Sequence, residues 1–474
     1  MNFRIIFAIA IGMFVTNLDA TILNIAFPTL AVKFNVGTGR ISLIELGYLI
    51  TLCTFLPVFA KIGEKKGTVY ILRWGYVVFI ATTVLCGLSP DLITLIILRS
   101  AQGIGGAMLL SVGNSLIVQH IPTEFRGRAY GINTLLGGVG FALGSPVGGF
   151  LTYHFGWRSV FFVSIIPAIA GLLLARKFLR NKGSECAAVP KFDISGSAIF
   201  FIFLATLIFI LNSGHHFGLT SIPIMAAAGV LVISMVGFIA NEKRAKDPLI
   251  NLSLFKNKNI TLGLYAGMAA VVILDGMSFL FPFYFENIRG FSTVKAGLIL
   301  GSFPLLTLFF SPLSGWLVDR FDARLVCTGS GSLLVLSTFL FSFFDSTVGL
   351  VNIFVAFIIF AIGLSLFLTA NTALVMGHSH DGSENTLSAL YSLIQTLGSA
   401  IGVAGFEMAY SLHLTNPNTP VNAIPVDVLS EGFRLAAGTA CAVSMSLFVV
   451  SLIARAGKND KLPVLGLAFK EAGK

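Results

Sequence analysis

Two charged residues lie inside long apolar stretches of this sequence, where a charge is costly. Arg99 is part of LRSAQGIGGA (98–107), between the apolar runs DLITLII and MLLSVGNSLIV, and Asp19 lies in the middle of the first apolar run. A charge in hydrocarbon costs at least about 2.5–3.5 kcal/mol on insertion scales, so such residues usually face a cavity or a partner. Asp19 is either a structural carboxylate or a group that binds a proton or a cation. Arg99 forms a buried ion pair, clamps backbone carbonyls or acts on a nearby carboxylate.

Two polar residues close to this pair are candidates for contacting a substrate. Gln102 follows Arg99 by three residues, which places both on one helix face and extends the polar network. Asn24 follows Asp19 by five residues, more than a full turn, so the two need not share a face. We expect Asn24 to form a hydrogen bond between helices, and we keep both residues as tentative substrate contacts.

A third charged residue, Asp275, lies near the middle of the apolar stretch AAVVILDGMSFLFPF. Its carboxylate could attract a lipophilic cation while the aromatic residues that follow add cation–π contacts, or it could be a second proton site. The alternative is a local structural role beside Gly276. The aromatic residues are equally well explained as lipid-facing or interfacial.

Three further acids lie close to the ends of apolar runs. Glu45, Glu286 and Glu407 fall in or beside the runs 41–60, 260–285 and 386–411. Acids near the edges of a membrane span are usually solvated, so we expect these three to play a lesser part.

The composition shows what positions these residues. Of 474 residues, 55% are hydrophobic and only 11% are charged, whereas a soluble domain carries about 25% charged residues. A helix needs about 20 apolar residues to cross a bilayer core of about 30 Å, and the sequence contains fourteen such runs. It therefore predicts an all-α integral membrane protein with 14 transmembrane helices.

The basic residues predict how the chain is oriented. Most of the 31 Lys and Arg residues fall in alternate short loops, among them KIGEKKG, EFRGR, NEKRAKDP and LFKNKN. Cytoplasmic loops carry such an excess, so both termini are expected in the cytoplasm. The formal charge of +10 then reflects orientation, and no nucleic acid partner is expected. Short loops suggest a bacterial plasma (cytoplasmic) membrane.

Several classes of chemistry find no support in the sequence. The five Cys residues are scattered without metal-ligand spacing, so neither a metal site nor a disulfide framework is predicted. No phosphate-binding loop is present, so ATP is not the direct energy source. The sequence shows neither a convergent catalytic set nor a soluble output domain, and it therefore does not favour an enzyme or a sensor.

An internal repeat divides the chain. AKIGEKKG (60–67) and SGWLVDRFDAR (314–324) place small, aliphatic, acidic and basic residues at matching offsets. Duplicated halves are typical of transporters. The second copy comes two helices later than a plain arrangement of six plus six helices would place it. This predicts an N-terminal six-helix half (1–192), a two-helix insertion (193–245) and a C-terminal six-helix half (246–474). The repeated loops predict cytoplasmic gate contacts, unless their charges only orient the chain; the residues concerned are Glu64, Lys65, Gly67, Asp319 and Arg320.

The fifth apolar run carries a glycine motif. Gly140, Gly144 and Gly148 recur every four residues, the spacing of tight contacts between membrane helices. Pro146 removes a helical hydrogen bond there and should kink the helix. Together with Gly149, these residues are expected to form a hinge between the two halves.

Four segments together resemble the major facilitator superfamily and, within it, the fourteen-span drug:proton antiporters. They are LDATILNIAFP (18–28), RSAQGIGGA (99–107), AKIGEKKG (60–67) and GFALGSPVGG (140–149). The chain departs from the family pattern at Ala60 (usually Gly), Glu64 (usually Asp) and Ser145, since the usual proline is shifted to Pro146. The resemblance implies that the counterpart of Arg99 takes part in proton transfer and that the glycine motif belongs to exporters.

The resemblance implies a secondary active transporter that exports hydrophobic or cationic small molecules in exchange for protons. We expect Asp19 and Arg99 to be the proton-linked pair. The partners are then a small-molecule substrate, protons and the lipid bilayer; the proton gradient drives transport without a cofactor, and the protein is a monomer. The sequence does not exclude an adaptor protein and an outer-membrane channel as further partners. The alternative is a transporter of a metabolite or nutrient on the same fold.

Overall fold

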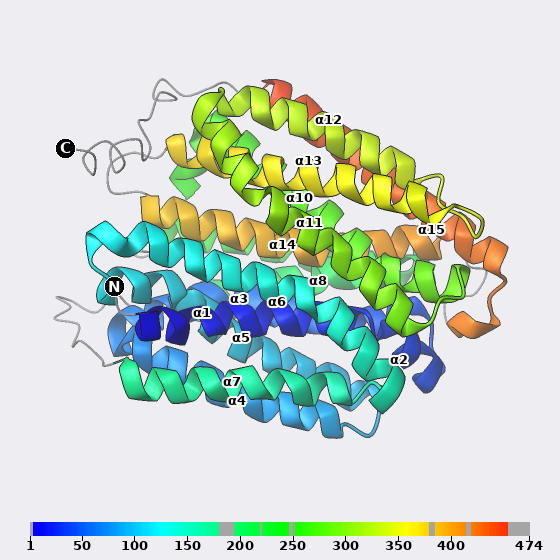
Figure 1. Cartoon of the computed structure of the whole chain (residues 1–474), viewed down its shortest axis with the longest axis horizontal. Helices are drawn as coiled ribbons and strands as arrows, with labels where there is room; N and C mark the ends of the chain where they lie inside the picture. The colour runs from blue at the N-terminus through cyan, green and yellow to red at the C-terminus, as the bar shows by residue number, and fades with distance from the viewer. Residues whose placement is uncertain are drawn as a thin grey trace.

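A computed structural model shows an all-helical protein whose helices run nearly parallel to one another (Figure 1). It describes residues 3–179, 194–218, 220–245, 250, 252–378, 384–413 and 419–453. Within these ranges there is no strand, and 14 helices are long and apolar enough to cross a membrane. The predicted fold class and number of spans are confirmed.

The N-terminal half consists of six long helices and one short one. The long helices are α1 (Phe3–Asn24), α3 (Thr38–Lys66), α4 (Thr68–Leu88), α5 (Leu92–His120), α6 (Arg126–Phe155) and α7 (Ser159–Phe178). The short helix α2 (Phe27–Phe34) follows α1 directly. Asn35 caps the end of this helix: its backbone is left-handed (φ +55°), and its N–H donates to the carbonyls of Ala31 and Val32.

The C-terminal half also contains six long helices. They are α10 (Lys258–Phe283), α11 (Thr293–Arg320), α12 (Ala323–Phe341), α13 (Leu350–Gly377), α14 (Glu384–Ser411) and α15 (Val426–Ile453). A π-helical turn, η3 (Tyr284–Ile288), extends α10. Short 3-10 turns lie at η1 (Thr123–Phe125), η2 (Leu252–Lys256) and η4 (Val421–Ala423).

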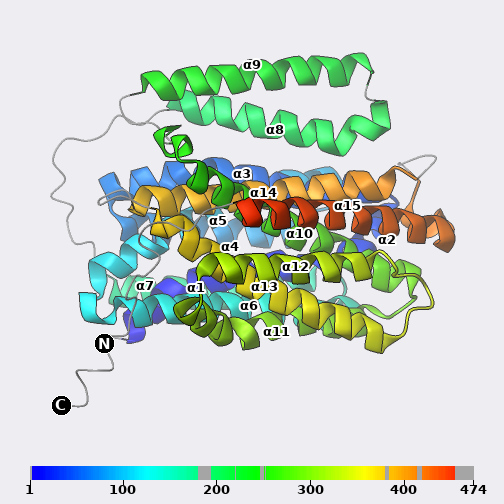
Figure 2. The same ribbon diagram turned by 90° about the horizontal axis from the view of Figure 1, so that it is seen from above.

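The two inserted helices lie at the edge of the bundle. Figure 2 shows α8 (Ile194–Phe217) and α9 (Ile222–Arg244) as an outer layer beside α3 and α14. The Asn212 amide on α8 donates to the Gly39 carbonyl (3.1 Å) and the Ser42 hydroxyl (2.7 Å) of α3. The predicted domain boundary at 192/193 lies outside the described residues, as does residue 246 at the second boundary.

The two ends of the bundle differ in how the halves meet. We call the end at which α1 begins the near end and the end at which α3 begins the far end. At the far end one continuous core contains residues of both halves, with Phe27 of α2 packed on Phe279 of α10 (5.5 Å between ring centroids). Towards the near end one core lies within the N-terminal half, around Leu72 and Leu116, and one within the C-terminal half, around Leu264 and Leu390. A smaller cluster joins Cys53 of α3 to Leu393 of α14 and to α8.

The seam between the halves follows the same pattern. On α6 and α11, Gly149 lies against the Thr293 carbonyl and Gly297 against the Ser145 carbonyl, all in the far-end halves of these helices. At the near end, no atom lies within 4 Å of a Cβ added to Gly127 or Gly131 of α6, or to Gly315 of α11. Between α6 and α11, the close backbone contacts of these glycines therefore lie in the far-end part of the seam.

Candidate functional site

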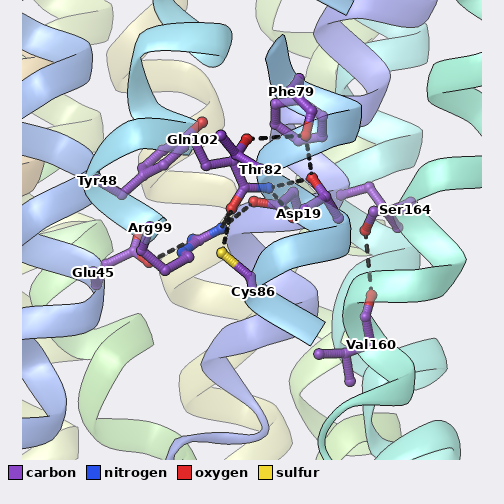
Figure 3. Close-up of polar contacts among 12 residues, drawn as sticks. Asp19, Glu45, Tyr48, Phe79, Thr82, Cys86, Arg99, Gln102, Val160 and Ser164 are labelled. Carbon is purple, nitrogen blue, oxygen red and sulfur yellow. Dashed lines mark hydrogen bonds and ion pairs between the residues drawn. The ribbon is translucent and has the colours of Figure 1, made fainter. Parts of the chain in front are cut away.

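Arg99 lies at the centre of a buried network of polar side chains in the N-terminal half (Figure 3). Its guanidinium donates to Asp19 of α1 at 2.5 Å through Nη1 and to Glu45 of α3 at 3.3 Å through Nη2. Both contacts are also ion pairs, and all three side chains are buried. One guanidinium thus holds two carboxylates from two different helices.

Gln102 connects this ion triad to a fourth helix, α4. Its amide nitrogen donates to the Asp19 carboxylate (3.1 Å) and to the Thr83 hydroxyl of α4 (2.8 Å), while its carbonyl oxygen accepts from Arg99 (2.7 Å). The Tyr48 ring of α3 lies under the guanidinium at 4.6 Å from its centroid. The structure therefore confirms the predicted shared face of Arg99 and Gln102, and it places Gln102 inside the network.

Glycines on α5 let the surrounding helices approach Arg99. A Cβ added to Gly105 would meet the Phe79 backbone of α4 at 2.8 Å, and one added to Gly103 would overlap the Tyr48 carbonyl of α3. Such close backbone contact is the usual role of small residues between membrane helices. The glycines around Arg99 therefore bring Asp19, Glu45 and Thr83 within reach of one turn of α5.

Glu45 and Glu407 depart from the sequence expectation, since both are buried rather than solvated. Helix α3 begins at Thr38, three residues before the apolar run, which places Glu45 two turns inside the helix. Glu407 of α14 accepts hydrogen bonds from Thr38 (3.1 Å) and Ser411 (2.5 Å). Glu286 is half-buried. Sequence analysis gave Glu45 a lesser part, whereas the structure pairs it with Arg99; an acid inside an apolar run was the signal that the sequence offered.

The triad can take up and release a proton. Two ionised carboxylates beside one guanidinium leave one negative charge in excess, and an excess charge is costly away from water. Binding one proton to either acid removes that charge and leaves one ion pair intact. A change in the distance between α1 and α5 would alter which state is favoured.

A cavity of about 30 Å³ lies between the two halves, close to the triad but separate from it. Helices α1, α6, α10, α11 and α13 form its walls. Its lining consists of Thr21, Asn24, Phe141, Ser145, Ser278, Phe281, Pro282, Leu300, Phe303, Pro304 and Phe357. None of these described residues is ionisable. This volume has room for about two water molecules and lies below the range of small-molecule sites.

Asn24 is on the wall of this cavity. The side-chain oxygen of Asn24 is buried and has no hydrogen-bond partner among the described residues. The expected hydrogen bond between helices is therefore wrong for that oxygen. The reason is geometric: Asn24 is the last residue of α1 and faces the space between the halves.

Asp275 lies on α10 one turn from the cavity. It is partly buried, accepts a hydrogen bond from Ser399 of α14 and is near enough to Glu45 for the two charges to interact. Ser278, three residues further on, lines the cavity. Asp275 is thus on the same face of α10 as the cavity without forming part of its lining.

The aromatic residues after Asp275 face inward. Phe279, Phe281, Phe283 and Tyr284 are all buried, which rules out the lipid-facing alternative. Phe281 packs edge-on against Phe357 at 5.1 Å between centroids. The rings fill the core of the C-terminal half, and one of them reaches the cavity.

The predicted gate residues lie at the near end, apart from the buried site. Glu64, Lys65, Asp319 and Arg320 are exposed, and Arg320 stacks on the Trp316 ring at 4.5 Å. Gly67 joins α3 to α4 with φ +98°, a conformation that favours glycine.

The predicted hinge residues divide between two contacts. Gly140, Gly144 and Gly148 pack against α1, where an added Cβ would overlap Phe14, Thr21 or Ile22. Gly149 and Pro146 face α11 across the seam, against Thr293 and Gly301. One face of α6 therefore holds its own half together and the other meets the second half.

A second cavity of about 20 Å³ lies at the near end of the C-terminal half, lined by Asn259, Asn371, His378, Ser451 and neighbouring apolar residues. Asn259 is hydrogen-bonded to His378 at 3.1 Å. Among the described residues there is no group of three or more His, Cys, Asp or Glu that could hold a metal ion.

Known proteins with this architecture are membrane transporters. Riboflavin transporter RibZ of Clostridioides difficile is 29% identical over 87% of this chain and 89% of its own length, and multidrug resistance protein Stp of Mycobacterium tuberculosis is 27% identical over 84% of this chain and 74% of its own. The crystal structure of a D-xylose–proton symporter, 16% identical, has a TM-score of 0.67 and covers 94% of this chain and 97% of its own. The family profile of the Major Facilitator Superfamily matches residues 9–403. The chain therefore belongs to the major facilitator superfamily of transporters.

Proposed function

We propose that this transporter exports hydrophobic or cationic small molecules in exchange for protons. The observation that carries the proposal is the buried triad of Asp19, Glu45 and Arg99 beside a cavity between the halves. Ionisable residues inside a membrane bundle are costly and usually serve ion or proton pathways. The multidrug resistance protein Stp is among its relatives.

The proposed orientation gives the structure a place in the transport cycle. If the near end faces the cytoplasm, as the basic loops favour, the close backbone contacts between α6 and α11 lie towards the outside. The exposed gate residues Glu64, Lys65 and Asp319 then belong to a gate that is open. They would come together when the halves rock to the opposite state.

The triad links protonation to the position of α1. When neither acid carries a proton, Arg99 holds Asp19 and Glu45 together and draws α1 towards α3 and α5. A proton on Asp19 weakens its ion pair with Arg99 and frees α1 to move relative to α5. Because α1 also carries Asn24 on the cavity wall, the proton and the substrate act on one helix.

A second candidate is a transporter of a metabolite on the same fold. The riboflavin transporter RibZ matches this chain over more of its length than Stp does. The cavity between the halves has both aromatic and polar residues on its wall. For a metabolite transporter, proton coupling and the direction of transport would both have to be measured.

The proposed setting is the plasma membrane of a bacterial cell. We propose a monomer that uses the proton gradient without a cofactor, in contact with lipid, protons and its substrate, and without nucleic acid. An adaptor and outer-membrane channel remain an open addition. Asp275 is proposed as a contact for the charge of cationic substrates or as a second proton site.

Efflux of ethidium from cells that express the protein tests the proposal. Wild type should export ethidium, and a protonophore should stop the export. Asp19→Asn and Arg99→Ala should abolish it, whereas Asp275→Asn should reduce export of cations but not of a neutral dye. If correctly inserted wild type moves none of these dyes, drug export is wrong, and riboflavin transport becomes the next measurement.

A further inference from the structure

Three cations from three helices gather at the near end of the N-terminal half. Arg4 of α1 and Lys177 of α7 lie against one ring, that of Phe178, at 5.5 and 5.6 Å from its centroid. Arg73 of α4 reaches the same helix end, where it donates to three backbone carbonyls of α7 and its cap, with the shortest bond to Leu179 at 2.7 Å. Three positive charges therefore surround the last turn of α7.

No acid balances these charges in the part of the chain that the structure describes. The ion pairs there involve other residues, and none includes Arg4, Arg73 or Lys177. The bonds of Arg73 all come from Nη2, and its buried Nε has no partner among the described residues. Like charges close to one another repel. An anion at this place would reduce the repulsion and accept hydrogen bonds from the remaining donors.

The surroundings of the three cations resemble the level of lipid headgroups. Figure 1 shows α4 and α7 along the lower edge of the bundle. Tyr70 and Trp74, both within a turn of Arg73 on α4, are exposed, and their ring centroids lie 6.3 Å apart. Exposed Tyr and Trp residues are enriched at the membrane–water interface.

An exposed apolar stripe on α7 leads to the cations. Its members share one helix face with Lys177, which is also exposed; they are Ile166, Ile169 and Leu173. An apolar stripe that ends in positive charge is complementary to a molecule with an acyl chain and an anionic head. Loop charges that only orient the chain need not converge on one ring or lie beside such a stripe.

We propose that Arg4, Arg73 and Lys177 bind the phosphate of an anionic phospholipid whose acyl chain lies along the stripe on α7. Basic pockets between membrane helices on the cytoplasmic side bind anionic headgroups, and the basic loops assign the near end to that side. The inference goes beyond the proposed function, because it concerns a lipid partner and depends neither on the substrate nor on proton exchange.

Fluorescence of Trp74, beside the proposed site, tests the assignment. The chain has three Trp residues, so Trp157→Phe with Trp316→Phe leaves Trp74 as the single reporter. A reference protein keeps only Trp316, at the near end of the C-terminal half; the two reporters are 47% and 46% exposed. Both proteins are reconstituted in phosphatidylcholine vesicles that contain a varied fraction of either phosphatidylglycerol or phosphatidylcholine with brominated acyl chains, which quench a neighbouring Trp.

Brominated phosphatidylglycerol should quench Trp74 at a mole fraction about tenfold or more below that of brominated phosphatidylcholine. Each cation near an anionic headgroup increases affinity about fivefold. At Trp316 one cation, Arg320, lies against the ring at 4.5 Å, so the difference there should be at most about fivefold. High salt should reduce the preference at Trp74.

Variants separate the three cations from the general basic character of this end. Arg4→Gln with Lys177→Gln should lower the preference at Trp74 to that at Trp316. Arg126→Gln is the matched control and should keep it, because Arg126 donates to carbonyls at the end of α5 much as Arg73 does at α7. Unchanged quenching of Trp74 by brominated phosphatidylcholine shows that a variant is folded and inserted.

Three results would overturn the assignment. The first is equal quenching of Trp74 by the two brominated lipids, or the same preference at Trp74 and Trp316. The second is a wild-type preference in the double variant. The third is loss of the preference when inorganic phosphate is added at constant ionic strength, because the site would then bind the free ion rather than the lipid.

Discussion

The two halves of this transporter bury different kinds of side chain. The N-terminal half places Asp19, Glu45 and Arg99 in one buried network with the Gln102 amide. The C-terminal half fills the corresponding depth with phenyl rings, among them Phe281. The ion triad therefore lies in the N-terminal half and a large ring cluster in the C-terminal half, which also buries Glu407, and the cavity lies where the halves meet.

Helix α1 connects the two regions. Asp19 faces Arg99 on α5, while Asn24, five residues later, faces the cavity and the C-terminal half. A helix that is held by a proton-sensitive ion pair on one face and by a substrate on the other can couple proton binding to substrate binding.

Removing Arg99 should have the largest effect. Arg99→Met leaves two buried acids without their cation, and breaking a buried pair from one side costs about 3–5 kcal/mol. The midpoint of thermal unfolding in detergent should fall accordingly. The triple variant Asp19→Asn, Glu45→Gln, Arg99→Met should recover most of that stability without recovering transport. Unchanged unfolding of Arg99→Met would contradict the buried triad.

Removing the Phe281 ring in the C-terminal half should affect stability and substrate binding rather than proton coupling. Phe281→Ala should destabilise the protein by about 3 kcal/mol, since it removes a large buried side chain beside an existing cavity. It should also weaken substrate binding while leaving proton coupling per substrate intact. Phe309→Ala, at a ring that is 75% exposed, is the control. Loss of coupling in Phe281→Ala would show that the halves do not divide these tasks.

Much of this comparison could be predicted from sequence, but not all of it. Apolar run lengths determine the fourteen spans, and the pairing of Asp19 with Arg99 follows from the cost of burying either alone. Glu45 was underestimated because the helix begins before its apolar run. The free Asn24 oxygen depends on how two halves pack, which no local pattern contains.

The seam between the halves should respond to smaller changes. Gly149→Ala would place a Cβ against the Thr293 carbonyl, and such overpacking costs about 1–3 kcal/mol. Because the contact exists only with the far end closed, the variant should favour the state open at that end. Spin labels at Tyr153 and Leu298, both exposed on α6 and α11, should show a longer distance. Gly113→Ala, where an added Cβ meets nothing, should leave that distance unchanged.

The exposed ion pair at the far end should contribute least. Arg434 donates to Asp345 at 3.1 Å, and exposed pairs contribute about 0–1 kcal/mol. Hydrogen bonds from the side chain and backbone of Thr347, aided by Val348 and Arg434, hold the pKa of Asp345 below its usual range. This contribution is therefore complete above the unfolded-state pKa of about 3.9 and is lost as pH falls through the lower folded value.

Thermal unfolding of Asp345→Asn checks this. The variant should unfold slightly below wild type at pH 7 and at pH 5, and the difference should shrink only below about pH 3.9. A difference that disappears between pH 7 and pH 5 would show that another group is responsible.

Proton movement in proteoliposomes tests the central claim most directly. Vesicles with an imposed acid interior and an internal pH dye receive ethidium from outside. We predict that ethidium dissipates the pH gradient in wild type, and that Asp19→Asn, with ethidium binding intact, leaves the gradient undisturbed. Dissipation by Asp19→Asn at the wild-type rate would contradict the account, because the proton would then move without the triad.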